Sequence, residues 1–158
     1  MRPFILIAVI VYTIGLLVGF QIDPVLAQRV DTGSFTVWDI ARNNLASVFV
    51  NIAGGLSLGV ISVLNTAYNG LILGYAVSIV LEHTSSTDFV RHFLPHSIEI
   101  VAIILSCALG LYIARFIWRT LLKSQDTKFQ KRTFIACLAL SVIIVLVAAF
   151  LEVNVSMR

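Results

Sequence analysis

Long apolar stretches with almost no charged residues recur along this chain and limit what it can fold into. A helix needs about 20 mostly apolar residues to cross a lipid bilayer. Five stretches meet this requirement, and they cover residues 4–20, 44–64, 66–81, 95–117 and 133–151. The sequence therefore predicts one all-α domain over residues 1–158, a polytopic transmembrane helix bundle with about five spans.

The composition excludes several classes of protein. Hydrophobic residues make up 59% of the chain and charged residues 12%, whereas soluble domains average about 45–50% and about 25%. We expect a multi-pass protein of the cell membrane, surrounded by the lipid bilayer. Nucleic-acid binding requires a basic face on a soluble surface, and the sequence shows none. Cys107 and Cys137 lie within apolar stretches and form neither a disulfide framework nor a C-x-x-C motif.

The first apolar stretch has two interpretations. Arg2 before it and residues 25–27 after it resemble the basic start and the cleavage site of a secretory signal, so residues 1–27 could be cleaved off. Against this, the stretch exceeds the about 7–15 apolar residues that are usual in a signal. Gly15 and Gly19 also have the spacing of a helix-packing face. We therefore favour a retained span.

Positively charged residues in the connecting loops predict the orientation of the chain. The loop after the fourth span holds six Lys or Arg residues, the loop after the first holds two beside three Asp, and residues 82–94 hold one. The six are Arg115, Arg119, Lys123, Lys128, Lys131 and Arg132. Because cytoplasmic loops carry the excess of Lys and Arg, the N-terminus is expected in the cytoplasm. The start of the fourth span is then on the outer side.

Almost nothing separates the second and third predicted spans, which end and begin at residues 64 and 66. This predicts a tight helical hairpin that turns between residues 64 and 66, and a re-entrant pair is the alternative. Before the second span, Thr36 and Asp39 have the spacing of a capping box. Trp38 suits the membrane surface, so a helix is expected to begin there.

Small and polar side chains repeat at helical spacing along the predicted spans. Three G-x-x-x-G pairs favour close helix packing. The pairs are Gly15/Gly19, Gly55/Gly59 and Gly70/Gly74. Polar residues form a candidate intramembrane cluster with six members. They are Asn44, Asn51, Asn69, His96, Glu99 and Glu152. These side chains either join neighbouring helices or share a polar interior, because unpaired amides in lipid are costly.

Pro95, His96 and Glu99 stand at the beginning of the fourth span. A proline at the first helical position puts His96 and Glu99 in the first turn, three residues apart on one face. Three roles stay open: bonds that join helices, the lining of a polar conduit, and catalysis with His96 and Glu99 as the candidate catalytic residues. No metal site is predicted, because H-x-x-E supplies two ligands and catalytic zinc usually takes three. No nucleophile motif or cofactor fingerprint occurs, so no cofactor is expected.

Several short motifs resemble one known family. They are Arg42-Asn43-Asn44, Ala53-Gly54-Gly55, Leu58-Gly59, Asn69-Gly70-Leu71-Ile72-Leu73-Gly74 and Leu94-Pro95-His96-Ser97-Ile98-Glu99. In order and spacing, over about residues 40–115, they resemble the stage II sporulation protein M family. Glu152 also lies where that family tends to carry a glutamate, whereas Ser97 replaces the glycine that usually follows its Pro-His pair.

The resemblance implies an integral membrane protein that works with other membrane proteins. Sporulation members of the family belong to a septal complex with peptidoglycan-degrading enzymes. Short members that resemble this chain occur in gene clusters for circular bacteriocins, where roles in maturation, export or producer immunity have been proposed.

From these observations we expect a non-enzymatic integral membrane subunit of a multi-protein membrane complex. It would act as a scaffold or gate in export, envelope remodelling, or bacteriocin production or immunity. The expected partners are other integral membrane proteins or further copies of the chain in a homo-oligomer. Two alternatives stay open: an intramembrane hydrolase or peptide-processing enzyme that uses His96 and Glu99, and a stand-alone small transporter or immunity protein.

Overall fold

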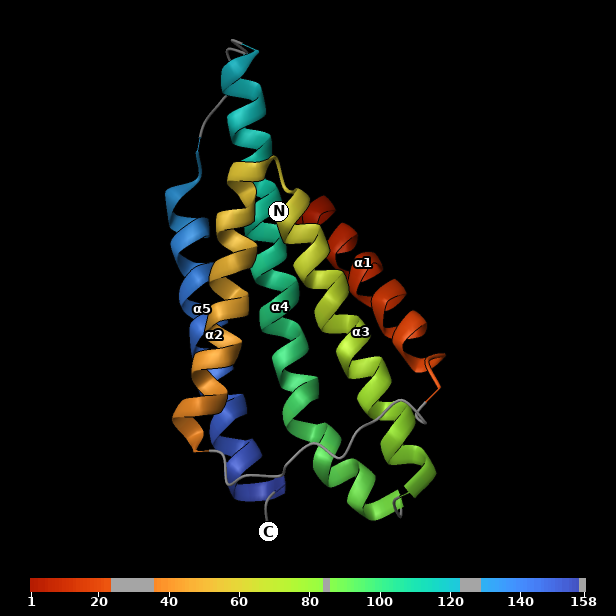
Figure 1. The fold of residues 1–158 in the computed structure, drawn as a ribbon. Helices are drawn as coiled ribbons and strands as arrows, with labels where there is room; N and C mark the ends of the chain where they lie inside the picture. Colours follow the sequence, from red (N-terminus) through yellow and green to blue (C-terminus); the bar gives the residue numbers. More distant parts are fainter. Residues whose placement is uncertain (24–35, 84–85, 123–128, 157–158) are drawn as a thin grey trace.

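The computed structural model describes residues 1–23, 36–83, 86–122 and 129–156, and within these ranges every regular element is a helix. The α-helices are α1 (Arg2–Phe20), α2 (Val37–Ala53), α3 (Val60–His83), α4 (Ser86–Leu121) and α5 (Lys131–Leu151) (Figure 1). The 3-10 helix η2 (Gly54–Ser57) follows α2, and the π-helix η3 (Glu152–Ser156) follows α5. The predicted all-α fold is confirmed.

Four of the described helices are long and apolar enough to cross a membrane, namely α1, α3, α4 and α5. The shorter helix α2 has 17 residues and includes Asp39 and Arg42. At about 1.5 Å per residue it is about 26 Å long, slightly less than the roughly 30 Å of a hydrocarbon core. The number of helices matches the five spans predicted. Four of them are long and apolar enough to cross a membrane, and α2 is not among these four.

The start of α2 follows from the predicted capping box, which is present. The backbone N–H of Asp39 donates to Thr36 Oγ1 (3.2 Å), and the backbone N–H of Thr36 donates to Asp39 Oδ2 (3.0 Å). Because these two bonds satisfy free N–H groups of the first turn, the helix begins at Val37. This is seven residues before the second predicted span at 44–64.

The turn between α2 and α3 lies at residues 54–59, so the predicted turn at 64–66 is wrong in position, although the tight hairpin is present. Leu58 and Gly59 have positive φ angles of 55° and 89°, which end the helix. Ser57 Oγ donates to the carbonyl of Gly54 (2.7 Å) and accepts from the N–H of Ile61 (3.0 Å). The turn residues are apolar or small, so hydropathy does not distinguish them from a span.

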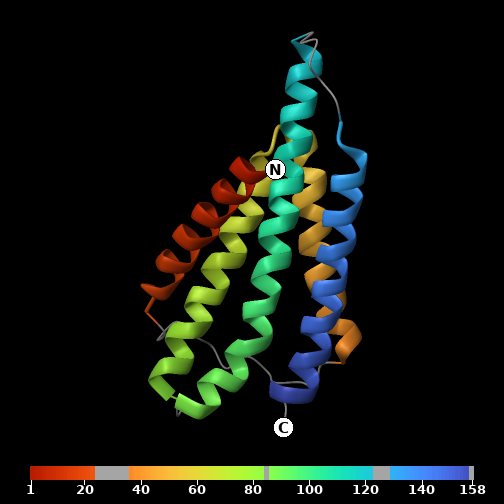
Figure 2. The same ribbon diagram turned by 180° about the vertical axis from the view of Figure 1, so that it is seen from behind.

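The helix α4 begins at Ser86, nine residues before Pro95. The prediction that Pro95 starts the helix, with His96 and Glu99 in its first turn, is therefore wrong. The prediction took the start of the apolar stretch as the start of the helix. Residues 86–94 are too polar for a membrane span, but they are helical. A proline inside a helix removes one backbone hydrogen bond and bends the helix. In agreement, the first turns of α4 lie at an angle to the remainder (Figure 2).

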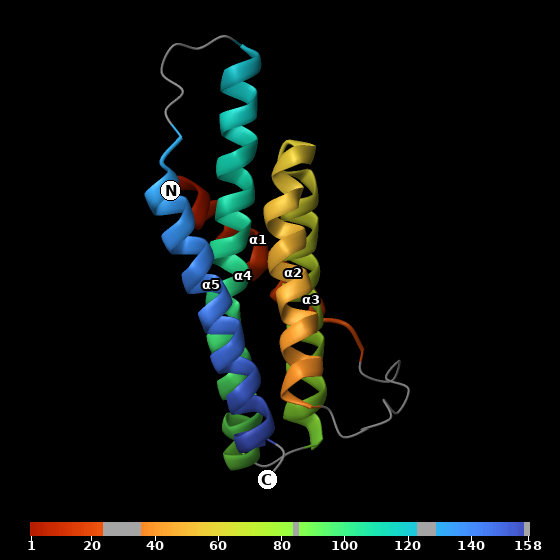
Figure 3. The ribbon, with the colours of Figure 1, turned by 90° about the vertical axis from the view of Figure 1, so that its left-hand side faces the viewer.

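The helix α4 is the centre of the bundle and contacts each of the other four helices. Seen from the side, α2 and α3 form one layer and α4 and α5 form another, while α1 packs against α3 and α4 (Figure 3). The middle of α4 carries a run of buried small residues. They are Ala102, Ser106, Cys107, Ala108 and Gly110. Small side chains there let four neighbours approach one helix closely.

The helices α1 and α3 pack through their G-x-x-x-G pairs, with each glycine against the backbone of the opposite helix. The contacts are Gly15 with Ala67, Gly19 with Leu71, Gly70 with Tyr12 and Gly74 with Leu16. From one contact to the next, the residue numbers rise on both helices, so α1 and α3 run in parallel. The chain must therefore return through residues 21–59, and α2 is the helix that runs in the opposite direction.

The third predicted pair, Gly55 and Gly59, does not form a helix face. Gly55 belongs to η2 and Gly59 to the turn that follows it. Gly55 nevertheless has a packing role, because a Cβ built there would lie 2.6 Å from the carbonyl oxygen of Gly110 and from the Cβ of Ile113. The hairpin turn thus rests directly on α4.

Candidate functional site

A buried amide joins the three central helices. The side-chain NH2 of Asn51 on α2 donates to Ser106 Oγ (2.9 Å) and to the carbonyl of Ile103 (3.3 Å), both on α4. Its oxygen accepts from Asn65 Nδ2 (2.9 Å) and from Thr66 Oγ1 (3.3 Å), both on α3. Asn51 is fully buried, and these four bonds use its whole hydrogen-bonding capacity.

Further polar contacts extend this seam along α2 and α3. Ser62 Oγ donates to the carbonyl of Asn51 (2.6 Å), and Asn65 Nδ2 also donates to the carbonyl of Ser47 (3.1 Å). Asn69 Nδ2 donates to the carbonyl of Asn65 (2.7 Å). Among the described residues, no buried side-chain nitrogen or oxygen lacks a partner. The seam is therefore saturated and serves to join helices.

Ionisable side chains meet below the seam, toward the start of α2 and the end of α5. His96 Nδ1 lies 3.5 Å from Glu99 Oε2, and His96 Nε2 lies 4.0 Å from Glu152 Oε1. The imidazole therefore stands between a carboxylate of its own helix and one from the end of α5. The exposed fraction of the side chain is 39% for His96, 16% for Glu99 and 22% for Glu152. The group faces an opening rather than the packed core.

Local structure explains how these three side chains converge. His96 and Glu99 are three residues apart on α4, so they share one face of the helix. Glu152 is the first residue of the π-helix η3, which continues α5. Asn154 Nδ2 donates to the carbonyl of Phe150 (2.7 Å) in this last turn. Short π-helical turns often occur at functional sites because they shift the side chains that follow.

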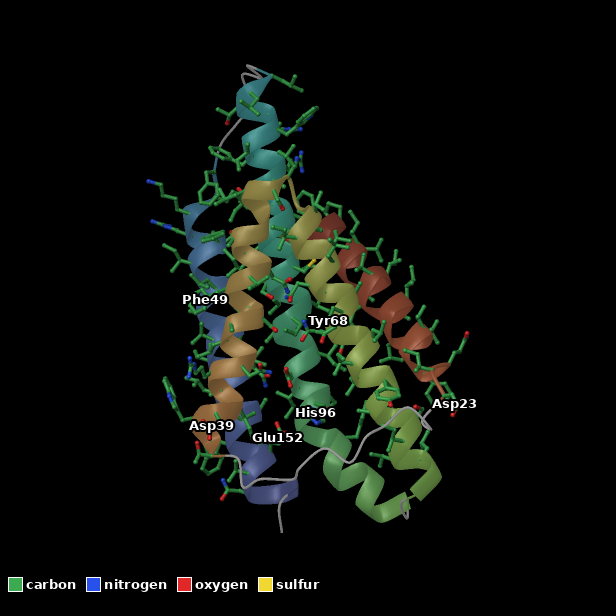
Figure 4. All side chains as sticks on the ribbon, in the orientation of Figure 1. Asp23, Asp39, Phe49, Tyr68, His96 and Glu152 are labelled. Carbon is green, nitrogen blue, oxygen red and sulfur yellow. The ribbon has the colours of Figure 1, made fainter. Side chains whose placement is uncertain are left out.

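The His96 group opens into a cleft of about 450 Å³. Figure 4 shows His96 and Glu152 in the space between the lower ends of α2 and α3, with α4 and α5 behind. The carboxyl and imidazole residues of the lining are Asp39, His96, Glu99 and Glu152, and the amides are Asn43, Asn44 and Asn69. The other lining residues are Tyr12, Ile40, Ile72, Leu73, Ala76, Ile100 and Ile103. The cleft is therefore polar on one part of its wall and apolar on the rest.

Asp39 lies at the rim of the cleft, in the first turn of α2. It accepts hydrogen bonds from the Thr36 hydroxyl (2.6 Å) and from the Thr36 N–H (3.0 Å). These bonds, together with the nearby Arg42, hold the pKa of the Asp39 carboxyl below its usual range. Asp39 therefore contributes a full negative charge to the cleft at neutral pH.

The lining limits the chemistry that the cleft can perform. Of the described residues that line it, none is Ser, Thr, Cys or Lys, whereas Asp, Glu, His and Tyr, which also act as nucleophiles in some enzymes, are present. In the described part of the chain, no three His, Cys, Asp or Glu side chains are arranged to hold a metal ion. What the arrangement offers is hydrogen bonding, negative charge and an imidazole able to accept or donate a proton.

The comparisons with known proteins identify a family for this chain. The model of the family described as stage II sporulation protein M matches residues 4–157. The chain belongs to this family. An uncharacterized protein of the archaeon Methanocaldococcus jannaschii is similar to it, with 26% identity over 169 residues that cover 99% of this chain and 95% of the relative. No solved structure matches the chain.

In this family member the cleft lies wholly inside the matched region. Every residue of its lining falls between residues 4 and 157. The resemblance found from short motifs over residues 40–115 thus extends to α1 and α5. This matters because Tyr12 of α1 and Glu152 at the end of α5 belong to the cleft.

The structure brings together five of the six residues of the predicted intramembrane cluster. Asn44, Asn69, His96, Glu99 and Glu152 line one cleft, whereas Asn51 lies in the closed seam next to it. Sequence reasoning missed other members of the site. They are Tyr12, Asp39, Asn43 and Asn65. Asn65 and Asn69 are four residues apart, a helical spacing that becomes visible once the turn is placed at 54–59.

Proposed function

We propose that this member of the stage II sporulation protein M family is a non-enzymatic integral membrane subunit of a larger membrane complex. We further propose that part of a partner protein occupies the cleft between α2 and α3. The observation that carries the proposal is the position of the cleft. It opens on the side of the bundle, between two helices, and extends from the start of α2 and the end of α5 to the middle of α3.

The depth follows from helix geometry. Asn69 lies nine residues after Val60, where α3 begins, or about 14 Å along the helix. This is near the middle of the membrane-compatible segment Val60–Leu81. On the opposite rim, Asn43 is exposed, and so is Ala76 on α3. Asn69 is half-buried near the middle of this segment, and an amide that faces lipid there is unfavourable because lipid offers no hydrogen bonds. A partner that covers the opening removes this cost.

The seam beside the cleft supports a binding role. Because Asn51 connects α2, α3 and α4 through saturated hydrogen bonds, the walls of the cleft are held in place without an occupant. Preformed sites bind at a lower entropic cost than sites that must be ordered. The partnership with other membrane proteins that the family resemblance implies points the same way.

Photocrosslinking in native membranes tests this proposal. A photoreactive amino acid is placed at Asn43 or Ala76, on the two rims of the cleft. Matched controls carry it at Ile143 or Leu146, which are exposed on α5. We expect crosslinks to one distinct membrane protein from the rim positions and only lipid adducts from the controls. Lipid adducts alone at all four positions would contradict the proposal.

A second candidate, an intramembrane hydrolase, is favoured by one observation. His96 has a carboxylate on each side, and a carboxylate that orients an imidazole is a common feature of general bases. A hydrolase would cleave the protein that occupies the cleft. The crosslinked partner would then be shorter in cells with the unchanged chain than in cells with Glu99→Gln. A partner of equal length in both removes the hydrolase from consideration.

A further inference from the structure

We infer that the cleft binds a protonated amine carried on an apolar stem, the chemistry of a lysine side chain. The inference rests on the proposed function, because it names the group of the partner that enters the cleft. The evidence for it is the size and the lining of the cavity. The charges of the lining indicate which kind of group the cavity accepts.

The size and walls of the cavity suit such a group. Its volume of about 450 Å³ lies within the range of about 300–1,000 Å³ that is usual for small-molecule sites. Ile72, Leu73 and Ala76 of α3 form an apolar wall, and Ile100 and Ile103 of α4 form the wall behind it. An aliphatic stem that leaves water or lipid headgroups for this surface loses little solvation and gains close contact.

The polar part of the lining is complementary to a cation. Glu99 and Glu152 reach the cavity from α4 and from the end of α5, and Asp39 reaches it from α2. No Lys or Arg occurs among the described residues of the lining. Asp39 already accepts two bonds from Thr36, so Glu99 and Glu152 are the main partners for an incoming charge.

Other ligand classes fit this lining less well. An anion would meet carboxylates on three sides, which repel it. A metal ion lacks an arranged set of three ligands in the described part of the chain. A neutral polar molecule could use the oxygens of Asn44 and Asn69 but would bring no positive charge to the two carboxylates that share one imidazole. A primary ammonium has three N–H donors, and the cleft offers several carboxylate and amide oxygens to accept them.

His96 holds the two carboxylates in place when no amine is present. The imidazole lies within 4.0 Å of both Glu99 and Glu152, on separate helices. It therefore keeps two groups of the same charge close together without a ligand. In the bound state the ammonium becomes their second cationic or hydrogen-bonding partner.

Thermal unfolding of the full chain in detergent tests the ligand class. Ligands that bind only the folded state raise the Tm. We expect n-butylamine to raise the Tm at pH 7.5, and we expect 1-butanol and pentanoate, with the same butyl stem, to leave it unchanged. Nα-acetyl-lysine amide and Nα-acetyl-norleucine amide form a second pair, which compares a lysine side chain with an apolar side chain that lacks the ammonium. An equal shift with butanol and butylamine would overturn the inference.

Variants locate the effect in the cleft. Glu99→Gln and Glu152→Gln should each weaken amine binding by about tenfold, because a charge-assisted hydrogen bond is lost. Asp23→Asn, which removes a carboxylate outside the cleft, should leave binding unchanged. Binding that is equally strong in Glu99→Gln, Glu152→Gln and Asp23→Asn contradicts the proposed site.

A filled cavity provides a test that keeps all charges. Ala76 is exposed on the rim, so Ala76→Phe places a ring at the entrance without disturbing the core. Ala139→Phe adds the same ring on an exposed face of α5. We expect amine binding to be lost in the first variant and retained in the second. Retention in both would overturn the inference even if the glutamate variants failed to fold.

The outcomes separate this inference from the proposed function. If the rim positions crosslink to one membrane protein but no amine binds, the proposed partner is retained and the proposed ligand class is rejected. If amines bind but no protein is crosslinked, the amine site is retained and the proposed partner is rejected. In the second case the lysine amide and butylamine should bind equally, as expected for a site that takes free amines.

Discussion

Asn51 carries more of the side-chain hydrogen bonding between helices than any other residue described above. Asn51→Ala leaves the groups on Asn65, Thr66 and Ser106 without this partner, and each unpaired buried group costs about 1–3 kcal/mol. Hydrogen bonds between membrane helices are worth somewhat less, about 0.6 kcal/mol on average. We expect a loss of about 2–3 kcal/mol in the free energy of unfolding, measured by denaturant titration in micelles.

Asn43 is the matched control for that measurement. Its NH2 makes a single long contact of 3.5 Å with Asn44 Oδ1, and the residue is exposed. Asn43→Ala should therefore change the free energy of unfolding by less than about 0.5 kcal/mol. Equal losses in the two variants would show that the seam does not hold the bundle together.

Some side chains of the cleft could be identified from the sequence and others could not. Asn44, Asn69, His96 and Glu99 could be identified because a polar group inside an apolar stretch is costly unless it has a partner. Tyr12 gave no such signal, since a lone tyrosine in an apolar helix is common at many depths. The contact between His96 and Glu152 joins residues 56 positions apart, and helical spacing contains no information about such pairs.

At the scale of helices, the packing of α1 on α3 can be tested with one substitution, Gly70→Ala. Helix propensity and steric overlap predict changes of opposite sign in its stability. Ala has a higher helix propensity than Gly, so propensity alone predicts that Gly70→Ala stabilises α3 by about 0.5–1 kcal/mol. A Cβ at residue 70 would instead overlap the backbone of Tyr12 on α1. Overpacking usually costs about 1–3 kcal/mol. We expect a lower Tm for Gly70→Ala in micelles.

Ala46→Leu serves as the control for that substitution. Ala46 is exposed on α2, and leucine keeps a high helix propensity. Its Tm should stay close to that of the unchanged chain. A higher Tm for Gly70→Ala would show that α1 and α3 are not in backbone contact at this point.

The helix ends show why apolar length was an incomplete guide. Hydropathy measures how much of a segment suits lipid, and it placed α1 and α5 within two residues of their observed bounds. It did not find the turn at 54–59, whose residues are all apolar or small and carry no charge. It also missed the first nine residues of α4, which are helical but polar. Hydrogen bonding ends and begins helices, and hydropathy does not report it.

At the scale of the molecule, the charges are distributed unequally between the two ends of the bundle. One end holds the start of α1, the end of α4 and the start of α5 (Figure 1). Its basic residues are Arg2, Arg115, Arg119, Lys131 and Arg132. Asp23, Asp39 and Glu152 lie toward the other end. By the positive-inside rule, we propose that the basic end is cytoplasmic and that the cleft opens toward the outer side.

Cysteine labelling tests this orientation with two exposed tryptophans. Trp38 is the second residue of α2, at the end of the bundle opposite the basic residues, and Trp118 lies near the basic end of α4. In a background with Cys107→Ser and Cys137→Ser, we expect Trp38→Cys to react with a membrane-impermeant maleimide on intact cells. Trp118→Cys should react only after lysis. The reverse pattern would contradict a cytoplasmic N-terminus.

The sequence by itself determined that the chain is a helical bundle suited to a membrane and that it belongs to this family. Both follow from local properties, since apolar length and short motifs are read along the chain. The tertiary structure alone decided that Glu152 meets His96 and that five polar residues share one cleft. It also decided that Asn51 lies outside that cleft. These are contacts between distant helices, set by which faces pack together, and the small residues of α4 and the glycines of α1 and α3 control that packing.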